Sequence, residues 1–410
     1  MKRQKIAVMG YGVVGSGVVE AFYNSLESIK RKINPDVDIK YILDIVEHKG
    51  TGFDEKFISD FNIIVNDPEV TVVAEVIGGI KPAYDFTKRC LEAGKSVVTS
   101  NKELVATKGA ELLKIAKEHN VLYLFEASVG GGIPIIRPLR MCLIGNNVKQ
   151  IAGIVNGTTN FILTKMFEEK MSFEDALSLA QNLGYAERNP SADIDGHDAC
   201  RKICILASLA CGKHVYPEFV HTEGITAITS DDVAAATKIG YSIKLIAYCK
   251  CLENDKLQVL VAPMLVPPAS RLSNIKDVFN GVVVTGDAVG EVAFYGRGAG
   301  KLPTASAVVS DIIECARLAP TDEPVLWDDC SENIVIDIKD SEFSFGLRVK
   351  CTENAENNLT SLFGEAELIS KSDDDVIFIT KTVKQADFEK ALNELKQRGE
   401  EVVSFFRVLK

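Results

Sequence analysis

A charged stretch at residues 184–202 contains the side chains of this sequence that are best suited to moving protons. It reads GYAERNPSADIDGHDACRK, with four carboxylates and three basic residues, and it runs directly into the apolar segment ICILASLACGK. Asp198 and Lys202 are four residues apart, so on a helix they lie on one face. An exposed salt bridge contributes only ~0–1 kcal/mol, which does not explain this much charge at the start of an apolar helix. A lysine oriented by a carboxylate suits proton transfer or anion binding, and a structural ion-pair network is the alternative.

The glycine-rich segment GYGVVG at residues 10–15 suits a dinucleotide, because it follows a short apolar strand and opens a helix. Gly10 permits a tight turn, Gly12 lets a pyrophosphate approach the backbone, and Gly15 lets helix and strand pack closely. The start of the helix offers N–H groups and a positive dipole to the phosphates. A glycine-rich turn without a ligand is the alternative, and the alternation of strands and helices that follows favours the dinucleotide.

Asp44 ends the second expected strand, where a carboxylate can accept hydrogen bonds from the ribose hydroxyls. It would repel a 2′-phosphate, so it favours NAD over NADP, although Lys49 lies near enough in sequence to reach a phosphate. A solvated loop aspartate is the alternative.

Three further motifs carry polar side chains or glycines between apolar runs. Asn101 and Lys102 follow a strand, at the edge of a parallel sheet where ligands bind. The segment FEASVGGGIPII (125–136) has three consecutive glycines, which suits either a close backbone approach to a ligand or a hinge. The segment GIVNGTTNFIL (153–163) could bond a carboxylate or cap the next helix.

The elements that must position these residues fall into three groups along the chain. In the first 125 residues, strands are expected at 5–10, 38–44, 62–65, 70–79, 96–100 and 121–127, and helices at 14–30, 82–92 and 109–119. This alternation predicts a parallel sheet covered on both faces. After Ile151, helices at 172–183 and 196–211 interrupt strands at 259–266 and 280–289. The last ~70 residues show strands around the helix 386–398, after an acidic linker at 320–333.

Composition excludes several classes of protein. The formal net charge is -11 and no basic block is present, so we expect neither nucleic-acid nor membrane binding. No run approaches the ~20 apolar residues that span a bilayer, and the N-terminus lacks the pattern of a signal peptide. The ten cysteines form no CxxC pair and share no metal-ligand spacing with the five histidines. Reduced, buried cysteines in a cytoplasmic protein are therefore expected.

Together these motifs resemble the homoserine dehydrogenase family along nearly the whole chain. The matching segments, in order, are GYGVVGSGVV, EVIGG, VVTSNKELVA, FEASVGGGIPI, GIVNGTTNFILTKM, LGYAERNPSADIDGHDACRK and FYGRGAGKLPTASAVVSD. The resemblance implies reversible, nicotinamide-linked reduction of aspartate 4-semialdehyde to homoserine, the step before the threonine, isoleucine and methionine branches. It implies a catalytic Lys202 held by Asp198, with Lys102 as a second active-site lysine.

The resemblance also implies the remaining site residues. Substrate contacts are expected from Glu187, Asp193, Gly157 and Thr158. Cofactor contacts are expected from Gly10, Gly12, Val13, Val14, Gly15, Asp44, Gly78, Ser100, Asn101, Lys102 and Gly300. Main-chain carbonyls at Glu126, Val129, Gly131 and Ile133 are expected to bind a monovalent cation, sodium by preference, which would account for the glycines.

The expected architecture is α/β in three domains and a linker. These are an N-terminal Rossmann-type domain (1–130, with 301–320 returning to it), an α+β catalytic and dimerisation domain (131–300), a linker (320–335), and a small βαββαβ, ACT-like domain (336–410). A homodimer or homotetramer is expected. Two departures from the family pattern stand out: Asp195 replaces a small polar residue, and the C-terminal unit lacks the Asp-x-Pro-Gly turn of the effector-binding helix, which leaves feedback control by threonine open.

Two other functions fit part of the pattern. A different Rossmann oxidoreductase acting on another small amino-acid aldehyde would share the same motifs. Activity measured on a panel of substrates would distinguish it from a homoserine dehydrogenase. A non-catalytic sensor of nucleotide and amino acid predicts ligand-dependent stability without turnover, and the intact lysines and glycines argue against it.

Overall fold

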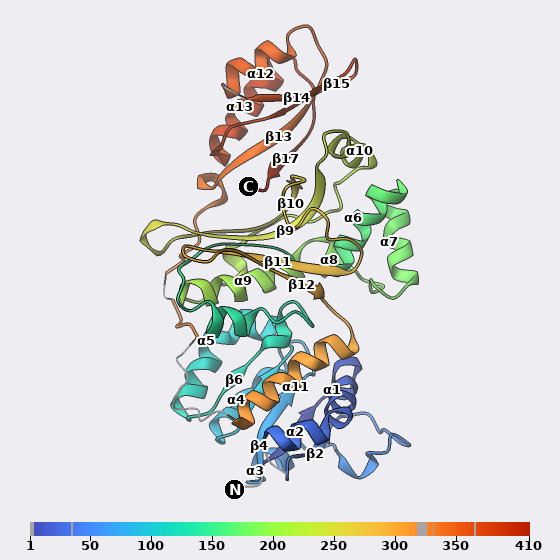
Figure 1. Ribbon diagram of the computed structural model, residues 1–410, viewed down its shortest axis with the longest axis vertical. Coiled ribbons are helices and arrows are strands. Elements are labelled where there is room, and N and C mark those ends of the chain that lie inside the picture. Colours follow the sequence, from blue (N-terminus) through green and yellow to red (C-terminus); the bar gives the residue numbers. More distant parts are fainter. Residues whose placement is uncertain (1–3, 34–35, 318–325, 331, 365) are drawn as a thin grey trace. The chain divides into compact units, whose positions relative to one another are not determined.

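The computed structural model describes residues 4–33, 36–317, 326–330, 332–364 and 366–410 (Figure 1). The chain forms two compact units. Unit 1 comprises Met1–Val148, Cys204–Pro217 and Gly286–Glu332, and unit 2 comprises Lys149–Ile203, Glu218–Thr285 and Asn333–Lys410. Part of the expected linker, 320–325 and 331, lies outside the described residues. The predicted domain boundaries stay a prediction.

Unit 1 contains a six-stranded parallel sheet in the order β3-β2-β1-β4-β5-β6, the Rossmann order. Its strands are β1 (Lys5–Met9), β2 (Asp38–Leu43), β3 (Phe57–Ile58), β4 (Val70–Glu75), β5 (Ser96–Thr99) and β6 (Tyr123–Leu124). Its helices are α1 (Val13–Asn24), α2 (Leu26–Lys32), α3 (Phe61–Asn66), α4 (Ala83–Glu92), α5 (Lys102–Glu118) and α11 (Lys301–Arg317), and unit 1 also carries β12 (Gly290–Arg297).

Both faces of this sheet are covered, as its continuous apolar strands require. Ile6 and Val8 of β1 belong to the core cluster that includes α1 and α11, whereas Ala7 and Met9, which alternate with them, are buried on the other face. A Cβ on Gly17 would lie 2.8 Å from the Lys301 carbonyl oxygen, so this glycine lets α1 and α11 pack closely.

Several predicted elements of unit 1 were wrong in type or extent, and the strands predicted at 70–79 and 121–127 are the shorter β4 and β6. Residues 62–65 are not a strand but part of α3, because Asp60 caps this short helix by accepting the Asn62 N–H, and Phe61 and Ile64 are buried at helical spacing. The strand beside β2 is β3 instead. The expected helix 14–30 is two helices that meet at Ser25. The helix expected at 109–119 begins seven residues earlier, at Lys102.

Unit 2 is built on a mixed sheet in the order β11-β7-β9-β10-β17-β13-β15-β14. The strands are β7 (Val148–Ile154), β9 (Ser242–Cys251), β10 (Leu257–Val266), β11 (Phe279–Gly286), β13 (Glu342–Lys350), β14 (Glu367–Lys371), β15 (Asp375–Ile379) and β17 (Val402–Val408), with the short β8 (His221–Thr222) and β16 (Val383–Lys384) beside β10 and β13. The helices are α6 (Gly157–Glu169), α7 (Phe173–Asn182), α8 (Ser191–Ile194), α9 (His197–Cys211, whose second half is assigned to unit 1), α10 (Ser230–Lys238), α12 (Ala355–Phe363) and α13 (Gln385–Gln397).

The C-terminal part of unit 2 has the predicted βαββαβ order. Its four long strands are antiparallel neighbours in the order β17-β13-β15-β14, a ferredoxin-like arrangement. Helices α12 and α13 pack on one face of these strands (Figure 1), where Phe345 and Phe388 stack with ring centroids 3.7 Å apart. β17 also pairs with β10 in parallel, so one sheet continues through unit 2. The predicted fold class is confirmed.

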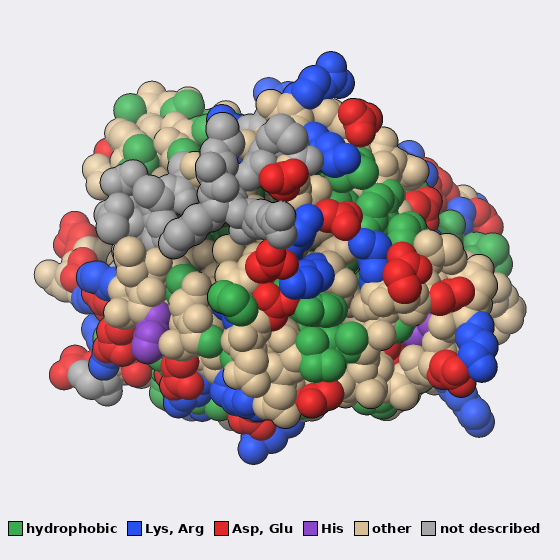
Figure 2. All heavy atoms as spheres, turned by 90° about the horizontal axis from the view of Figure 1, so that it is seen from below, with side chains coloured by type: hydrophobic (Ala, Val, Ile, Leu, Met, Phe, Trp, Pro, Cys, Tyr) green, Lys and Arg blue, Asp and Glu red, His purple; other side chains and the backbone are tan. Residues whose placement is uncertain are grey.

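Surface charge and helix hydropathy are the features that bear on binding to nucleic acids and membranes. On the face drawn in Figure 2, acidic and basic side chains are interspersed among those coloured by type, and no broad area of Lys and Arg gathers there. None of the described helices has the length and hydropathy needed to cross a membrane.

Candidate functional site

Lys202 and Asp198 form a buried ion pair on α9. The Lys202 Nζ lies 2.6 Å from the Asp198 Oδ2 and donates a second hydrogen bond of 2.7 Å to the Val155 carbonyl oxygen. The two side chains are 10% and 4% exposed. Since a pair this buried is much less screened than a surface pair, its charges act strongly on whatever binds beside them. The helical spacing of the two residues predicted this contact.

Asn156 connects this pair to Asp193. Its Nδ2 donates to the Asp193 Oδ1 at 2.6 Å and to the Asp198 Oδ2 at 2.8 Å. Its Oδ1 accepts the Thr159 N–H at 2.9 Å, which caps α6. Asn156 was not among the predicted site residues, although its position before the helix that begins at Gly157 is a helix-cap signal.

The other expected substrate residues differ in how the structure connects them to this cluster. Gly157 begins α6, and a Cβ there would lie 2.9 Å from the Val278 carbonyl oxygen, so a larger residue does not fit. The Thr158 hydroxyl donates to the Tyr185 carbonyl oxygen at 2.6 Å, which ties the turn to the charged stretch. Glu187 is exposed, and among the described residues no hydrogen bond or ion pair joins its carboxylate to the cluster.

The glycine-rich turn of unit 1 has the shape that a pyrophosphate needs. Gly10 has a φ of +98°, and a Cβ on Gly15 would lie 2.0 Å from the Gly10 oxygen. A Cβ on Gly12 would meet nothing within 4 Å, so open space lies beside the start of α1, which has no side-chain cap. Val13, at this helix start, is exposed, and Val14 is half-buried. A bound phosphate would satisfy the first N–H groups of the helix.

Asp44 holds the glycine-rich turn in place. Its Oδ2 accepts the Tyr11 N–H at 2.7 Å and its Oδ1 accepts the Val46 N–H at 2.9 Å. Partial burial raises the pKa of Asp44, but these two hydrogen bonds and the neighbouring His48 ring together outweigh burial and lower the pKa below its usual value. Ile45, directly after Asp44, is 96% exposed, so its apolar side chain could pack against an aromatic ring of a bound ligand. Lys49 pairs with Glu47 at 2.9 Å.

A buried carboxylate, Glu75, organises the loops at the carboxyl ends of β4 and β5. Its Oε2 accepts the Thr99 hydroxyl proton at 2.6 Å, and its Oε1 accepts the N–H groups of Ile77 and Gly78 at 2.8 and 3.3 Å. Burial raises the pKa of Glu75, although these hydrogen bonds favour the charged form. Glu75 was not among the predicted site residues, because its place in the sequence does not indicate which loops its carboxylate will bond.

Asn101 continues this network into α5. Its backbone N–H donates to the Thr99 Oγ1 at 2.9 Å, its Nδ2 donates to the Gly79 carbonyl oxygen at 2.6 Å, and its Oδ1 caps α5. Lys102 is the first residue of that helix and is half-buried, and its N–H donates to the Ser100 oxygen at 3.1 Å. The structure therefore places Gly78, Ser100, Asn101 and Lys102 at one edge of the unit 1 sheet, whereas Lys202 belongs to unit 2.

The segment 126–137 closes on the side chain of Glu126. This carboxylate accepts the N–H groups of Ile135, Ile136 and Arg137 at 2.7, 2.9 and 2.6 Å. Gly130 and Gly131 have φ values of +73° and +54°. The expected cation ligands Glu126, Val129, Gly131 and Ile133 thus lie on one closed and largely buried loop.

Two neighbouring features support this loop. A Cβ on Gly131 would lie 2.4 Å from the Gly298 oxygen, in the turn that also contains Gly300 with a φ of +123°. Asp311 of α11 accepts the Glu126 N–H at 2.8 Å, and Arg137 donates to it at 3.0 Å. Burial and the nearby Glu126 charge raise the pKa of Asp311 to about 7. Among the described residues, no group of three or more His, Cys, Asp and Glu side chains could hold a metal ion.

Comparisons with known proteins agree with one another. The family model "Homoserine dehydrogenase, NAD binding domain" matches residues 10–126, and "Homoserine dehydrogenase" matches residues 134–313. The homoserine dehydrogenase of Bacillus subtilis is 37% identical and covers 100% of this chain and 99% of its own length. The crystal structure of a homoserine dehydrogenase from Thiobacillus denitrificans is similar with a TM-score of 0.91, 31% identity and full coverage of both chains.

A more distant structure carries a cofactor. A hyperthermophilic archaeal homoserine dehydrogenase, solved in complex with NADPH, is 28% identical with a TM-score of 0.64 and covers 79% of this chain and 99% of its own. The Rossmann order of the unit 1 sheet, the buried lysine–aspartate pair and the full-length matches lead to one conclusion. The chain belongs to the homoserine dehydrogenase family and is a nicotinamide-dependent oxidoreductase.

Proposed function

We propose that Lys202 transfers the proton when this homoserine dehydrogenase interconverts homoserine and aspartate 4-semialdehyde. The observation that carries this role is the fixed position of its amine, 2.6 Å from the Asp198 carboxylate and 2.7 Å from the Val155 carbonyl oxygen. In oxidation the neutral amine accepts the hydroxyl proton of homoserine, and in reduction the ammonium returns it to the oxygen of the aldehyde. Asp198 orients the amine and stabilises its charged form.

Unit 1 supplies the residues that would hold the dinucleotide. The first N–H groups of α1 face the pyrophosphate, Gly12 leaves it room, and the exposed Ile45 and Val13 offer apolar contact. A bound nicotinamide would supply the redox chemistry, as the hydride acceptor in oxidation and the hydride donor in reduction. NAD is favoured because Asp44 places a carboxylate where a 2′-phosphate would lie. NADP is the alternative, since the archaeal relative was solved in complex with NADPH.

The other residues receive roles that follow from charge and position. Asp193 and Glu187 attract the ammonium group of the substrate, and the turn of Gly157 and Thr158 contacts its backbone atoms. Lys102, at the start of α5, stabilises developing negative charge or carries a proton.

The loop 126–133 binds a monovalent cation, expected to be sodium, through main-chain carbonyl oxygens. The positive φ values at Gly130 and Gly131 and the closure of the segment on Glu126 support this site, since a hard cation prefers several oxygen ligands on a curved backbone. We also propose a homodimer or homotetramer, a cytoplasmic location, the predicted domain boundaries, and a subunit-pairing role for the ACT-like C-terminal unit.

The test is Lys202→Met, with Lys256→Met as a control because Lys256 is an exposed lysine of the same unit. A positioned acid or base contributes about 10²–10⁴-fold, so kcat for homoserine oxidation should fall by that factor in Lys202→Met alone. Binding of NADH or NADPH, measured by fluorescence titration, should be unchanged in both variants. Near-normal turnover in Lys202→Met would remove the proposed role.

A further inference from the structure

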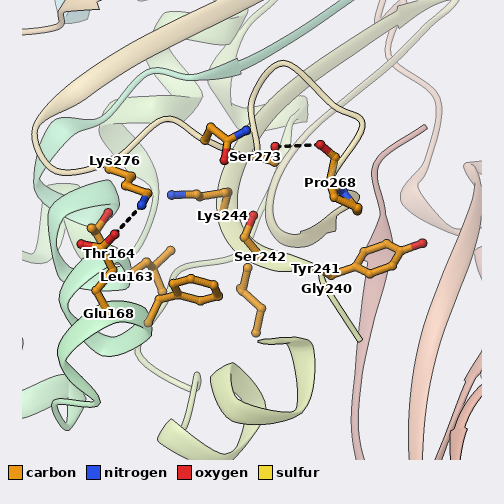
Figure 3. A pocket seen from close by; sticks show the side chains of 13 residues that line it. Leu163, Thr164, Glu168, Gly240, Tyr241, Ser242, Lys244, Pro268, Ser273 and Lys276 are labelled. Atoms are coloured by element: carbon orange, nitrogen blue, oxygen red, sulfur yellow. Dashed lines mark hydrogen bonds and ion pairs between the residues drawn. The ribbon is translucent and has the colours of Figure 1, made fainter. Parts of the chain in front are cut away.

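Unit 2 contains a cavity of about 190 Å³ whose lining does not include Lys202, Asp198 or Asn156. The second half of α6, the start of β9 and the loop 268–276 surround it (Figure 3). Its polar lining includes Ser242, Lys244, Glu168 and Lys276. Nothing in the proposed reaction uses these side chains.

Lys244 brings a buried positive charge to this cavity. The residue is 5% exposed, and its Nζ donates to the Ile275 carbonyl oxygen at 2.6 Å and to the Asn160 Oδ1 at 3.0 Å. Both acceptors are neutral, and among the described residues no carboxylate lies within salt-bridge distance of this amine. Burial and the nearby Lys276 charge lower the pKa of Lys244 to about 8. An anion in the cavity would therefore supply the counter-charge that Lys244 lacks.

Ser242 adds a hydroxyl group to the same side of the cavity lining. Its Oγ is shielded from solvent and has no hydrogen-bond partner in the part of the chain that the structure describes. Ser242 and Lys244 are two residues apart on β9, so their side chains emerge on the same face of the strand. Buried hydroxyl groups without a partner are rare in proteins, and an acceptor that reaches both side chains would satisfy them together.

The charges and the apolar lining define the ligand. Lys276 pairs with Glu168 at 2.5 Å, and Figure 3 shows the Lys244 side chain pointing toward the side of the cavity that carries this pair, while Tyr241 points away. Two lysines and one glutamate leave one net positive charge in the lining, which matches a monoanion. The carboxylates of Glu168 and of Asp277, which lies next to the lining and acts on Lys244, would repel a dianion. Leu163 and Phe167 add apolar contact.

We propose that this cavity binds a small aliphatic monocarboxylate, whose oxygens accept hydrogen bonds from the Ser242 hydroxyl and the Lys244 amine. The hydrocarbon part of the ligand packs against the apolar side chains of α6. Such a site is separate from the residues proposed to bind the substrate, and it requires no change in the fold.

Asn160 links the cavity to the catalytic pair. Its Oδ1 accepts from Lys244, and its backbone N–H donates to the Asn156 carbonyl oxygen at 3.3 Å, one turn earlier on α6. Asn156 in turn donates to Asp198, which holds Lys202. A carboxylate that draws Lys244 away from Asn160 should therefore alter the geometry of Asn156. This link, but not the cavity site itself, rests on the proposed role of Lys202.

Binding is tested by titrating the full-length protein with butyrate labelled with ¹³C at the carboxyl carbon and following its NMR signal. Saturable binding is expected, and 1-butanol and inorganic phosphate should compete weakly or not at all. Lys244→Met should weaken butyrate binding by at least about tenfold, because a hydrogen bond to a charged group is lost, and Ser242→Ala by about threefold to tenfold. Lys165→Met, which removes a lysine of α6 outside the cavity lining, should bind butyrate normally.

Several results would overturn the site: no saturable butyrate binding, equal binding by folded Lys244→Met, or equal binding of 1-butanol or phosphate. Thermal unfolding confirms that each variant is folded, and Ser242→Ala provides the test if Lys244→Met is not. Homoserine oxidation should change in kcat or KM with butyrate in the wild type and not in Lys244→Met. Binding without a kinetic effect would overturn the link through Asn160. A wild-type protein that binds butyrate without any turnover would instead count against the proposed function.

Discussion

Replacement of Asn156 by Asp tests whether this residue holds the catalytic aspartate in place. The substitution keeps the size of the side chain and an oxygen that can cap α6, but it removes the Nδ2 group that donates to Asp193 and Asp198 at 2.6 and 2.8 Å. Three carboxylates then face one another beside Lys202. The fold should survive, because Asp and Asn cap helices about equally well.

The magnitude follows from the bond to Asp198, because the carboxylate of Asp198 accepts a hydrogen bond from the Lys202 amine. A hydrogen bond to a charged group contributes about 1.5–3 kcal/mol, so its loss should lower kcat/KM for homoserine by about 10- to 150-fold. The added negative charge favours the protonated amine of Lys202, which cannot accept a proton. The rising limb of the oxidation rate should therefore move to higher pH.

The assay is the rate of NADH or NADPH formation from homoserine between pH 6 and pH 10, with Asn156→Ser as the comparison. Serine also caps a helix but adds no charge and cannot reach both carboxylates, so this variant should lose activity without the shift in pH profile. If Asn156→Asp is folded and keeps its kcat/KM within about twofold and its pH profile unchanged, Asn156 does not position the catalytic pair.

Three further predictions concern unit 1. Glu75→Gln should become more stable relative to the wild type as pH rises. Burial raises the folded-state pKa of Glu75, so the wild type loses stability as pH rises from about 4.5 through that pKa. Thermal unfolding of both proteins across this pH range measures the difference. Asp44→Ser should raise the NADP-to-NAD ratio of kcat/KM in steady-state assays, and an unchanged ratio would remove Asp44 from cofactor selection. In Gly131→Ala the Cβ would lie 2.4 Å from the Gly298 oxygen, so this variant should have a lower melting temperature and a turnover rate that depends less on sodium. In Gly145→Ala the Cβ would meet nothing within 4 Å, so neither property should change.

The features that could be predicted from the sequence are local or periodic. The parallel sheet follows from apolar strands that alternate with helices, and the Asp198–Lys202 contact follows from a spacing of four residues on one helix. The error at 62–65 has the same origin. Four residues of type NIIV look like a strand, and only the cap at Asp60 and the burial of Phe61 and Ile64 decide for a helix. A pattern shorter than two helical turns does not separate the two.

The residues that could not be predicted are those that act across long separations in the sequence. Glu75 bonds Thr99 from the neighbouring strand, and Asn156 bonds Asp193 of α8 and Asp198 of α9. Neither contact leaves a periodic pattern, because each depends on where the fold brings two loops together. Glu126 is a similar case: its position was selected for a main-chain carbonyl, yet its carboxylate accepts three N–H groups that close the loop.

The two asparagines that cap α5 and α6 suggest why this residue type stands at both positions. Asn101 and Asn156 each accept a backbone N–H with Oδ1, a task that Ser, Thr or Asp performs as well. Each also donates through Nδ2, Asn101 to the Gly79 oxygen and Asn156 to two carboxylates. A short side chain that both accepts and donates twice is found only in asparagine, since aspartate donates nothing when ionised and serine has a single proton. The helix cap explains a polar residue at each position. The bond to Gly79 excludes an ionised aspartate at 101, and the two donated bonds explain the amide at 156.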